Sequence, residues 1–139
     1  MFGLKARLGI TTGVAIMAAG FAVLPASQAL ASARSCQNEA NGFLEGCANV
    51  NGSGLHINSL QGVVTNIGVG DQHMVHLELS GPHGLIKNCP TITVGSLDSD
   101  SCTWSPNANE TAGSYCVTVW QFASNKWVAR AKACVGVHK

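Results

Sequence analysis

Residues 112–137 read AGSYCVTVWQFASNKWVARAKACVGV. Two runs rich in β-branched and aromatic residues flank the polar segment Ser124-Asn125-Lys126, a pattern typical of a β-hairpin. If these three residues form the loop, Ala123 pairs with Trp127, and paired residue numbers sum to 250. Cys116 then lies directly opposite Cys134, and we predict a disulfide between them.

This register divides the hairpin into two faces, because side chains alternate along a strand. The face expected to pack in the core carries small or apolar residues: Tyr115, Val117, Val119, Ala129, Ala131, Ala133 and Val135. The other face carries the residues that we predict to bind a protein partner: Trp120, Phe122, Val128, Arg130 and Lys132. In this register Trp120 lies opposite Arg130 as a cation–π pair, and Trp127 lies on the opposite face from Trp120.

The first 33 residues have the three parts of a secretory signal peptide. Lys5 and Arg7 give a positive start, residues 8–24 are uncharged and mostly apolar, and Ala31-Ser32-Ala33 is a small-x-small cleavage site. Ser27-Gln28-Ala29 is a second possible site. We therefore expect a secreted, extracellular protein whose mature form has no membrane segment.

Removing residues 1–33 from the 139-residue chain leaves 106 residues, with six basic and seven acidic side chains. The net charge is then −1 with His neutral, which argues against a nucleic-acid binder or a binder of anionic membranes. All six cysteines lie in this part, and an even number in a secreted chain indicates three disulfides. The simplest of the fifteen possible pairings is sequential: Cys36–Cys47, Cys89–Cys102 and Cys116–Cys134.

Residues 34–54 are rich in Asn and Gly and contain few apolar residues. We predict a polar N-terminal leader closed by Cys36–Cys47, which either packs on the edge of the domain or projects toward a partner. Residues 55–139 contain about seven short strands separated by turns, and no amphipathic helix, which predicts a small antiparallel β-sandwich domain stabilised by disulfides. The strand that begins at Leu55 is expected to break or bulge near Gly62.

The segment from Glu110 to Cys116, ETAGSYC, resembles the start of the sixth strand of immunoglobulin-like domains, where a corner Tyr precedes a Cys. Trp104 resembles the core Trp of those domains. The resemblance implies an all-β, immunoglobulin-like sandwich. Those domains have Tyr-x-Cys, whereas Tyr115 and Cys116 are adjacent and face opposite sides. The usual bridge between sheets is therefore not expected, in agreement with a bridge inside the hairpin.

The overall plan is a secreted chain with a polar leader and a disulfide-bonded β-domain. It is similar to small cysteine-rich secreted proteins of actinobacteria, and within them to the adaptor subunits of umbrella toxin particles. Those adaptors link a lectin-bearing, trypsin-like subunit to the large toxin polypeptide. The resemblance implies that residues 34–54 would be the segment inserted into a partner.

The sequence contains no pattern for catalysis, a metal or a cofactor. A GxSxG motif is absent, and no carboxylate pair can be assigned to glycoside hydrolysis. His76 and Glu78 share one face of a strand, and Asp98 and Asp100 share a loop, but neither pair completes a ligand set. We therefore predict a protein that is not an enzyme and acts by binding.

Three binding functions follow. The first is a module that binds another secreted protein, through the leader and the Trp120 face, in an antibacterial toxin complex. The second is a protease inhibitor that presents the loop between Cys89 and Cys102. The third is carbohydrate binding through Trp104, Trp120 and Trp127. It is disfavoured because Trp120 and Trp127 are expected on opposite faces of the hairpin and could not form one flat platform.

Overall fold

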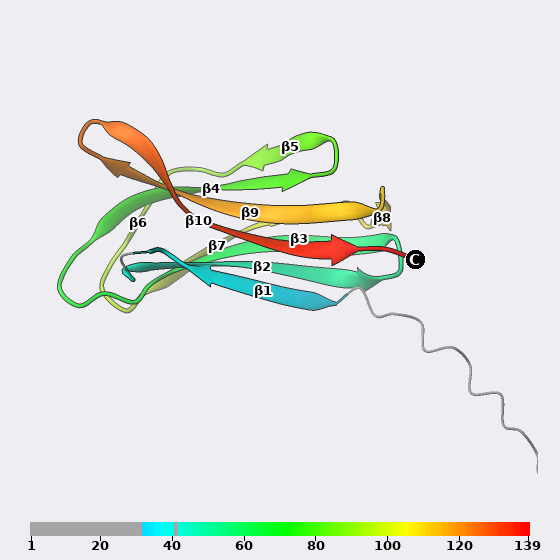
Figure 1. Cartoon of the computed structure of the whole chain (residues 1–139), viewed down its shortest axis with the longest axis horizontal. Helices are drawn as coiled ribbons and strands as arrows, with labels where there is room; N and C mark the ends of the chain where they lie inside the picture. The colour runs from blue at the N-terminus through cyan, green and yellow to red at the C-terminus, as the bar shows by residue number, and fades with distance from the viewer. Residues whose placement is uncertain (1–31, 41) are drawn as a thin grey trace, which may run out of the picture.

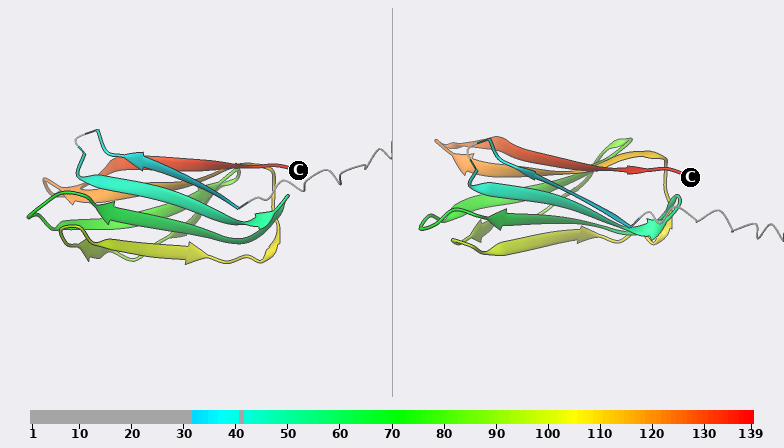
Figure 2. Two further views of the ribbon diagram at one scale, coloured as in Figure 1. Left: turned by 90° about the horizontal axis from the view of Figure 1, so that it is seen from below. Right: turned by 60° about the horizontal axis from the view of Figure 1, so that its bottom comes forward.

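The computed structural model describes residues 32–40 and 42–139, which form two packed layers of antiparallel strands (Figures 1 and 2). The strands are β1 (Ala33–Asn38), β2 (Leu44–Ser53), β3 (His56–Asn66), β4 (His73–Gly81), β5 (Gly84–Asn88), β6 (Ile92–Val94), β7 (Ser99–Trp104), β8 (Ala108–Asn109), β9 (Gly113–Ala123) and β10 (Lys126–Val137). This arrangement confirms the predicted all-β sandwich. In the described part of the chain, no helix is long and apolar enough to span a membrane. The predicted signal peptide falls, except for Ser32 and Ala33, outside the described residues.

The first sheet has the order β1-β2-β3-β7, and β8 pairs with the start of β3. Residues 34–54 supply β2 and nearly all of β1, so of the two arrangements expected for this segment the structure has the first: it packs on the edge of the sandwich as a hairpin and does not project as a separate leader. β2 lies between β1 and β3 and buries Leu44, Ala48 and Val50. This segment contributes to the core despite its small residues because the two sheets approach closely there. A Cβ added to Gly46 would lie 2.7 Å from a methyl group of Val119.

The second sheet has the order β10-β9-β4-β5, and β6 pairs with β4. The chain passes between the sheets from β3 to β4, from β6 to β7 and from β8 to β9. Strands β2, β3 and β7 thus face β10, β9, β4 and β5, which is the strand arrangement of an immunoglobulin-type sandwich. Three strands exceed the seven predicted from the sequence: β1, β2 and the two-residue β8.

The six cysteines pair sequentially, as Cys36–Cys47, Cys89–Cys102 and Cys116–Cys134. This confirms the predicted Cys116–Cys134 bridge and the presence of three disulfides, and it selects the simplest of the pairings that the sequence left open for the other four cysteines. The first joins β1 to β2 and the third joins β9 to β10, so each lies within one sheet. The second joins the segment after β5 to β7 and therefore bridges the two sheets. None of the cysteines in the described residues is a free thiol, a state that indicates an oxidising environment.

A tyrosine corner closes the end of the sandwich where β9 begins. The Tyr115 hydroxyl donates a 2.7 Å hydrogen bond to the backbone oxygen of Thr111, and the Tyr115 side chain is buried. This geometry agrees with the immunoglobulin-like resemblance at this segment. The proposed equivalence of Trp104 is wrong, because Trp104 ends β7 in the first sheet, whereas the core Trp of those domains lies on the strand that corresponds to β4.

β3 runs without a break through Gly62, which corrects the bulge predicted there. Gly62 pairs with Ala48 on one side and Cys102 on the other, and the bulge lies instead nearer the start of β3, at Asn58, between the pairs Asn51–Ser59 and Gly52–Ile57. Glycine is required at position 62 by packing. A Cβ there would come within 2.9 Å of side-chain atoms of both Leu79 and Val117 in the facing sheet.

The β9–β10 hairpin has a two-residue turn in place of the predicted three-residue loop. Ser124 and Asn125 both have positive φ, 52° and 61°, as a type I′ turn requires, and Lys126 pairs with Ala123. Near the turn, paired residue numbers therefore sum to 249. A β-bulge between Ala129 and Ala131 restores the predicted sum of 250 for the rest of the hairpin, including the cysteine pair.

Candidate interaction face

The turn and the bulge determine which side chains share the outer surface of the second sheet. Between the turn and the bulge, Trp127 pairs with Phe122 and Ala129 pairs with Trp120, while His76 of β4 pairs with Trp120 from the other side. Paired residues project to the same face of a sheet, so the two tryptophans lie on one surface. We name this surface, at the turn end of the hairpin, the aromatic face, and it consists of Met74, His76, Trp120, Phe122 and Trp127.

The rings of the aromatic face contact one another. His76 and Trp120 are parallel within 5°, with centroids 6.2 Å apart, and Trp127 stands at 89° to the His76 ring, with centroids 4.5 Å apart. Phe122 meets Trp127 edge to face at 5.3 Å. Such contacts hold aromatic side chains in fixed orientations, each pair contributing about 0.5–1.5 kcal/mol beyond the area it buries.

Much of this apolar surface is open to solvent. Met74 is 46% exposed, Phe122 39% and Trp127 37%. Trp120 is more covered, and its indole N–H is buried with no hydrogen-bond partner among the described residues. Trp120 and His76 therefore form the base of the aromatic face, and Met74, Phe122 and Trp127 form its accessible part.

Polar residues border the aromatic face one row further from the turn. Thr118 pairs with Lys132 of β10 on one side and with Glu78 of β4 on the other, so a cation and an anion flank it. Lys132 is exposed and Glu78 is half-buried. An apolar centre with a polar border is the usual composition of a protein–protein interface.

Two of the predicted binding residues, Val128 and Arg130, lie elsewhere. The two-residue turn shifts Val128 opposite Gln121, on the inner side of the sheet, and Arg130 is the extra residue of the bulge. The Arg130 Nε donates a 2.8 Å hydrogen bond to Gln121 Oε1. The predicted Trp120–Arg130 pair is therefore wrong, while Trp120, Phe122 and Lys132 do project outward, and Trp127 takes the place predicted for Val128.

Arg130 instead connects the hairpin to the first sheet through an ion pair. Its Nη1 lies 3.4 Å from Oε1 of Glu39, a buried residue at the end of β1. Gln121 continues the contact, since its side-chain nitrogen donates to His73 Nδ1 at 2.7 Å. This chain of four polar side chains links β1, β10, β9 and β4 beneath the aromatic face. It holds the hairpin end, and with it the aromatic face, against the rest of the sandwich.

The outer surface of the first sheet has a different character. It is polar and carries cross-strand hydrogen bonds between neighbouring side chains. Asn49 Nδ2 donates to Gln61 Oε1 at 3.3 Å, and the hydroxyls of Thr65 and Ser99 are 2.9 Å apart. Only the second sheet thus presents clustered aromatic rings among the described residues.

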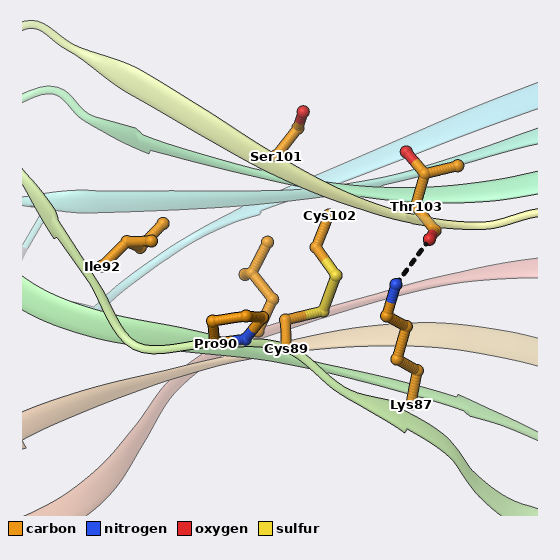
Figure 3. Close-up of a pocket in the computed structure, with 8 residues that line it drawn as sticks. Lys87, Cys89, Pro90, Ile92, Ser101, Cys102 and Thr103 are labelled. Carbon is orange, nitrogen blue, oxygen red and sulfur yellow. Dashed lines mark hydrogen bonds between the residues drawn. A yellow bond between two sulfur atoms is a disulfide. The ribbon is translucent and has the colours of Figure 1, made fainter.

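A cavity of about 320 Å³ lies beside the disulfide that bridges the sheets (Figure 3). Figure 3 shows Lys87 reaching across it, and the Lys87 Nζ donates a 2.9 Å hydrogen bond to the backbone oxygen of Thr103. The side chains that line the cavity include neither a carboxylate nor a histidine. Among the residues that line it, Lys87 is the one titratable side chain, since the sulfurs of Cys89 and Cys102 are bonded to each other.

One group of potential metal ligands converges within residues 32–40 and 42–139: Cys36, Glu45 and Cys47. The two sulfurs are bonded to each other, so neither is a thiolate that could bind a metal. His76 packs against indole rings, as described above, and its strand neighbour Glu78 borders Thr118.

The loop proposed for protease inhibition is largely part of the sandwich. Residues 89–102 contain β6 and part of β7, each paired in a sheet, which leaves a short turn at its tip. Leu97 at this tip is exposed but has a positive φ of 59°. A peptide that binds to a protein surface as an added strand has an extended backbone. The left-handed backbone of Leu97 is not extended, so the tip of this loop is not favoured for insertion into a protease cleft.

Neither a protein-family model, nor a curated protein, nor a solved structure matches this chain.

Proposed function

We propose that this chain is a secreted, non-catalytic module that binds another secreted protein through the aromatic face. The observation that carries the proposal is the convergence of two tryptophans, a phenylalanine and a methionine on one exposed surface of a rigid sheet. Tryptophan is enriched among the residues that dominate binding energy in protein interfaces. The three disulfides and the polar chain beneath the face reduce the conformational entropy that binding would cost.

The orientation of the rings favours a protein partner over a flat polysaccharide. Trp120 is parallel to His76, and Trp127 is perpendicular to His76, so the two indole planes are nearly perpendicular to each other. A flat sugar chain would need coplanar rings on which successive residues could stack. Perpendicular rings beside an exposed methionine instead form an uneven apolar surface, which suits insertion of protein side chains.

The resemblance to umbrella toxin adaptors extends the proposal to an adaptor subunit of an extracellular antibacterial complex. Because residues 34–54 form an edge hairpin of the sandwich, we place the partner contact on the aromatic face rather than on an inserted leader. An adaptor joins two partners, and the exposed edge of β1 is available to a second one.

The test is affinity purification of the tagged chain from its native culture, followed by mass spectrometry. Trp127→Ala removes the most central exposed ring, and we expect it to lower recovery of the specific partner at least about tenfold, the loss typical of an interface hot spot. Leu85→Ala is the matched control, because Leu85 is 61% exposed on the same sheet and pairs with Ser80 away from the aromatic face. Equal recovery with both variants, each folded, would exclude the aromatic face as the binding site.

A second candidate is carbohydrate binding, which the structure favours more than the sequence did. The sequence placed Trp120 and Trp127 on opposite faces, whereas they share one. A single sugar ring can stack on Trp127 without a coplanar neighbour. Titration of soluble oligosaccharides with tryptophan fluorescence tests this candidate, and a glycan array without hits would reject it.

A further inference from the structure

The Cys36–Cys47 disulfide lies on the outer surface of the first sheet, between the edge strand β1 and its neighbour β2. Cys36 is exposed, while Cys47 is fully buried. An external thiolate can therefore approach the Cys36 sulfur, and attack on that sulfur would release Cys47 as the leaving group.

A guanidinium group lies across both sulfurs. Arg34 Nε is 3.2 Å from Cys36 Sγ, and Arg34 Nη2 is 3.4 Å from Cys47 Sγ. A neighbouring cation stabilises a thiolate, and a leaving thiol of lower pKa departs faster in thiol–disulfide exchange. Glu45 acts in the opposite direction, because its Oε1 lies 3.5 Å from Cys47 Sγ and a carboxylate disfavours a nearby anion.

We propose that Cys36 is a modification site for small thiols, at which Arg34 promotes thiol–disulfide exchange. The thiolate sulfur of the small thiol bonds to Cys36 Sγ, the Cys36–Cys47 bond breaks, and its electron pair remains on Cys47 Sγ beside the Arg34 guanidinium. The product is a mixed disulfide at Cys36 and a thiolate at Cys47. A second thiolate can then attack the sulfur of the attached small thiol, which releases a small-molecule disulfide and leaves both cysteines reduced.

The other two disulfides serve as internal comparisons. Cys116–Cys134 also joins directly opposed residues of adjacent strands, with Cα atoms 4.1 Å apart against 4.0 Å in Cys36–Cys47. Lys132 lies two residues before Cys134, as Arg34 lies two residues before Cys36, but no hydrogen bond joins Lys132 to either sulfur in the described part of the chain. Cys89–Cys102 lies between the sheets, with Cys89 buried.

The experiment exposes the purified, folded chain to reduced glutathione near neutral pH, quenches with acid, alkylates free thiols and locates each adduct by peptide mass spectrometry. We expect glutathione first on Cys36 and the alkylating label first on Cys47. Arg34→Gln should slow this exchange about threefold to tenfold, because the leaving thiolate loses its cation. Glu45→Gln should accelerate it, and the control Lys132→Gln should leave the Cys36 rate unchanged.

Circular dichroism of each variant verifies that the fold is retained before the rates are compared. An unchanged rate in folded Arg34→Gln would overturn the role of Arg34. Adducts that form first at Cys116 or Cys134 would overturn the assignment of the site. Glu45→Gln provides an independent measurement, since a slower rate in that variant would contradict the electrostatic explanation even if Arg34→Gln were unstable.

Discussion

Substitution of Ser124 by glycine should stabilise the protein, because the type I′ turn holds Ser124 at a φ of 52°. A left-handed backbone conformation destabilises an L-residue by about 1–2 kcal/mol, and glycine does not have this cost. Glycine loses about 0.5–1 kcal/mol through its greater freedom in the unfolded chain. The expected net gain is about 0.5–1 kcal/mol, or roughly 2–8 °C in the midpoint of thermal unfolding for a domain of this size. Asn125→Gly should gain less, because asparagine tolerates this conformation.

Lys126→Gly is the control that separates the two possible loops. Lys126 is paired with Ala123 in the ladder, so glycine there should destabilise the chain by about 0.5–1 kcal/mol. Thermal and urea unfolding, followed by circular dichroism under identical conditions, measures all three variants. If Lys126→Gly were stabilising and Ser124→Gly were not, the loop would have three residues, Trp127 would leave the aromatic face, and the proposed binding surface would be wrong.

Three further substitutions test the packing and electrostatics described above. Gly62→Ala should lower the free energy of unfolding by about 1–3 kcal/mol in urea titrations, because the added methyl group overlaps side chains of the facing sheet. Burial, and secondarily the charge of Glu110, raises the pKa of Tyr115, so the folded state favours the neutral phenol. The neutral Tyr115 phenol therefore contributes stability that is fully present below about pH 10 and is lost as the pH rises above that value. Tyr115→Phe should remove this loss of stability at alkaline pH. At neutral pH the same substitution should cost about 1 kcal/mol, because the hydrogen bond to Thr111 is lost. Glu39→Gln should cost about 1–2 kcal/mol in the same titrations, since Arg130 would keep only a neutral partner.

The sequence predicted the fold class, the number of disulfides and the Cys116–Cys134 pair, but neither the pairing of the other four cysteines beyond the simplest pattern nor the hairpin register near the turn. Cys116–Cys134 was predicted correctly from a loop of the wrong length, because the turn is one residue shorter and the bulge adds one residue on the β10 side. Loop length alone cannot reveal such a compensation. Serine and asparagine are weaker indicators of a type I′ turn than Asn-Gly, so the sequence did not distinguish a two-residue from a three-residue loop.

The edge hairpin β1–β2 was also outside what composition could predict. A run rich in Asn and Gly with few large apolar residues is typical of a loop. Here the small residues Gly46 and Ala48 face the core, since the sheets approach too closely for larger side chains. Composition indicates how much apolar surface a segment could bury. The spacing between the sheets decides how much apolar surface the segment needs to fill the core, and composition does not reveal that spacing.

The bulge at Arg130 connects these observations to the proposed function. Between the turn and the bulge, β10 is shifted by one residue, so Trp127 projects outward and Val128 inward. The same shift directs Arg130 to Gln121 and Glu39, where its charge is matched by a carboxylate from the first sheet. Arg130 is the one extra residue on β10, so its deletion would leave side chains alternating regularly from Trp127 to Lys132, with Trp127 still opposite Phe122 and Cys134 still opposite Cys116. Deletion of Arg130 should therefore keep Trp127 on the aromatic face, the disulfide intact and partner binding unchanged, while it lowers the free energy of unfolding by about 1–3 kcal/mol because the buried Glu39 loses its charged partner. Affinity purification and urea unfolding of the deletion variant measure both effects, and loss of partner binding in a folded deletion variant would contradict this register.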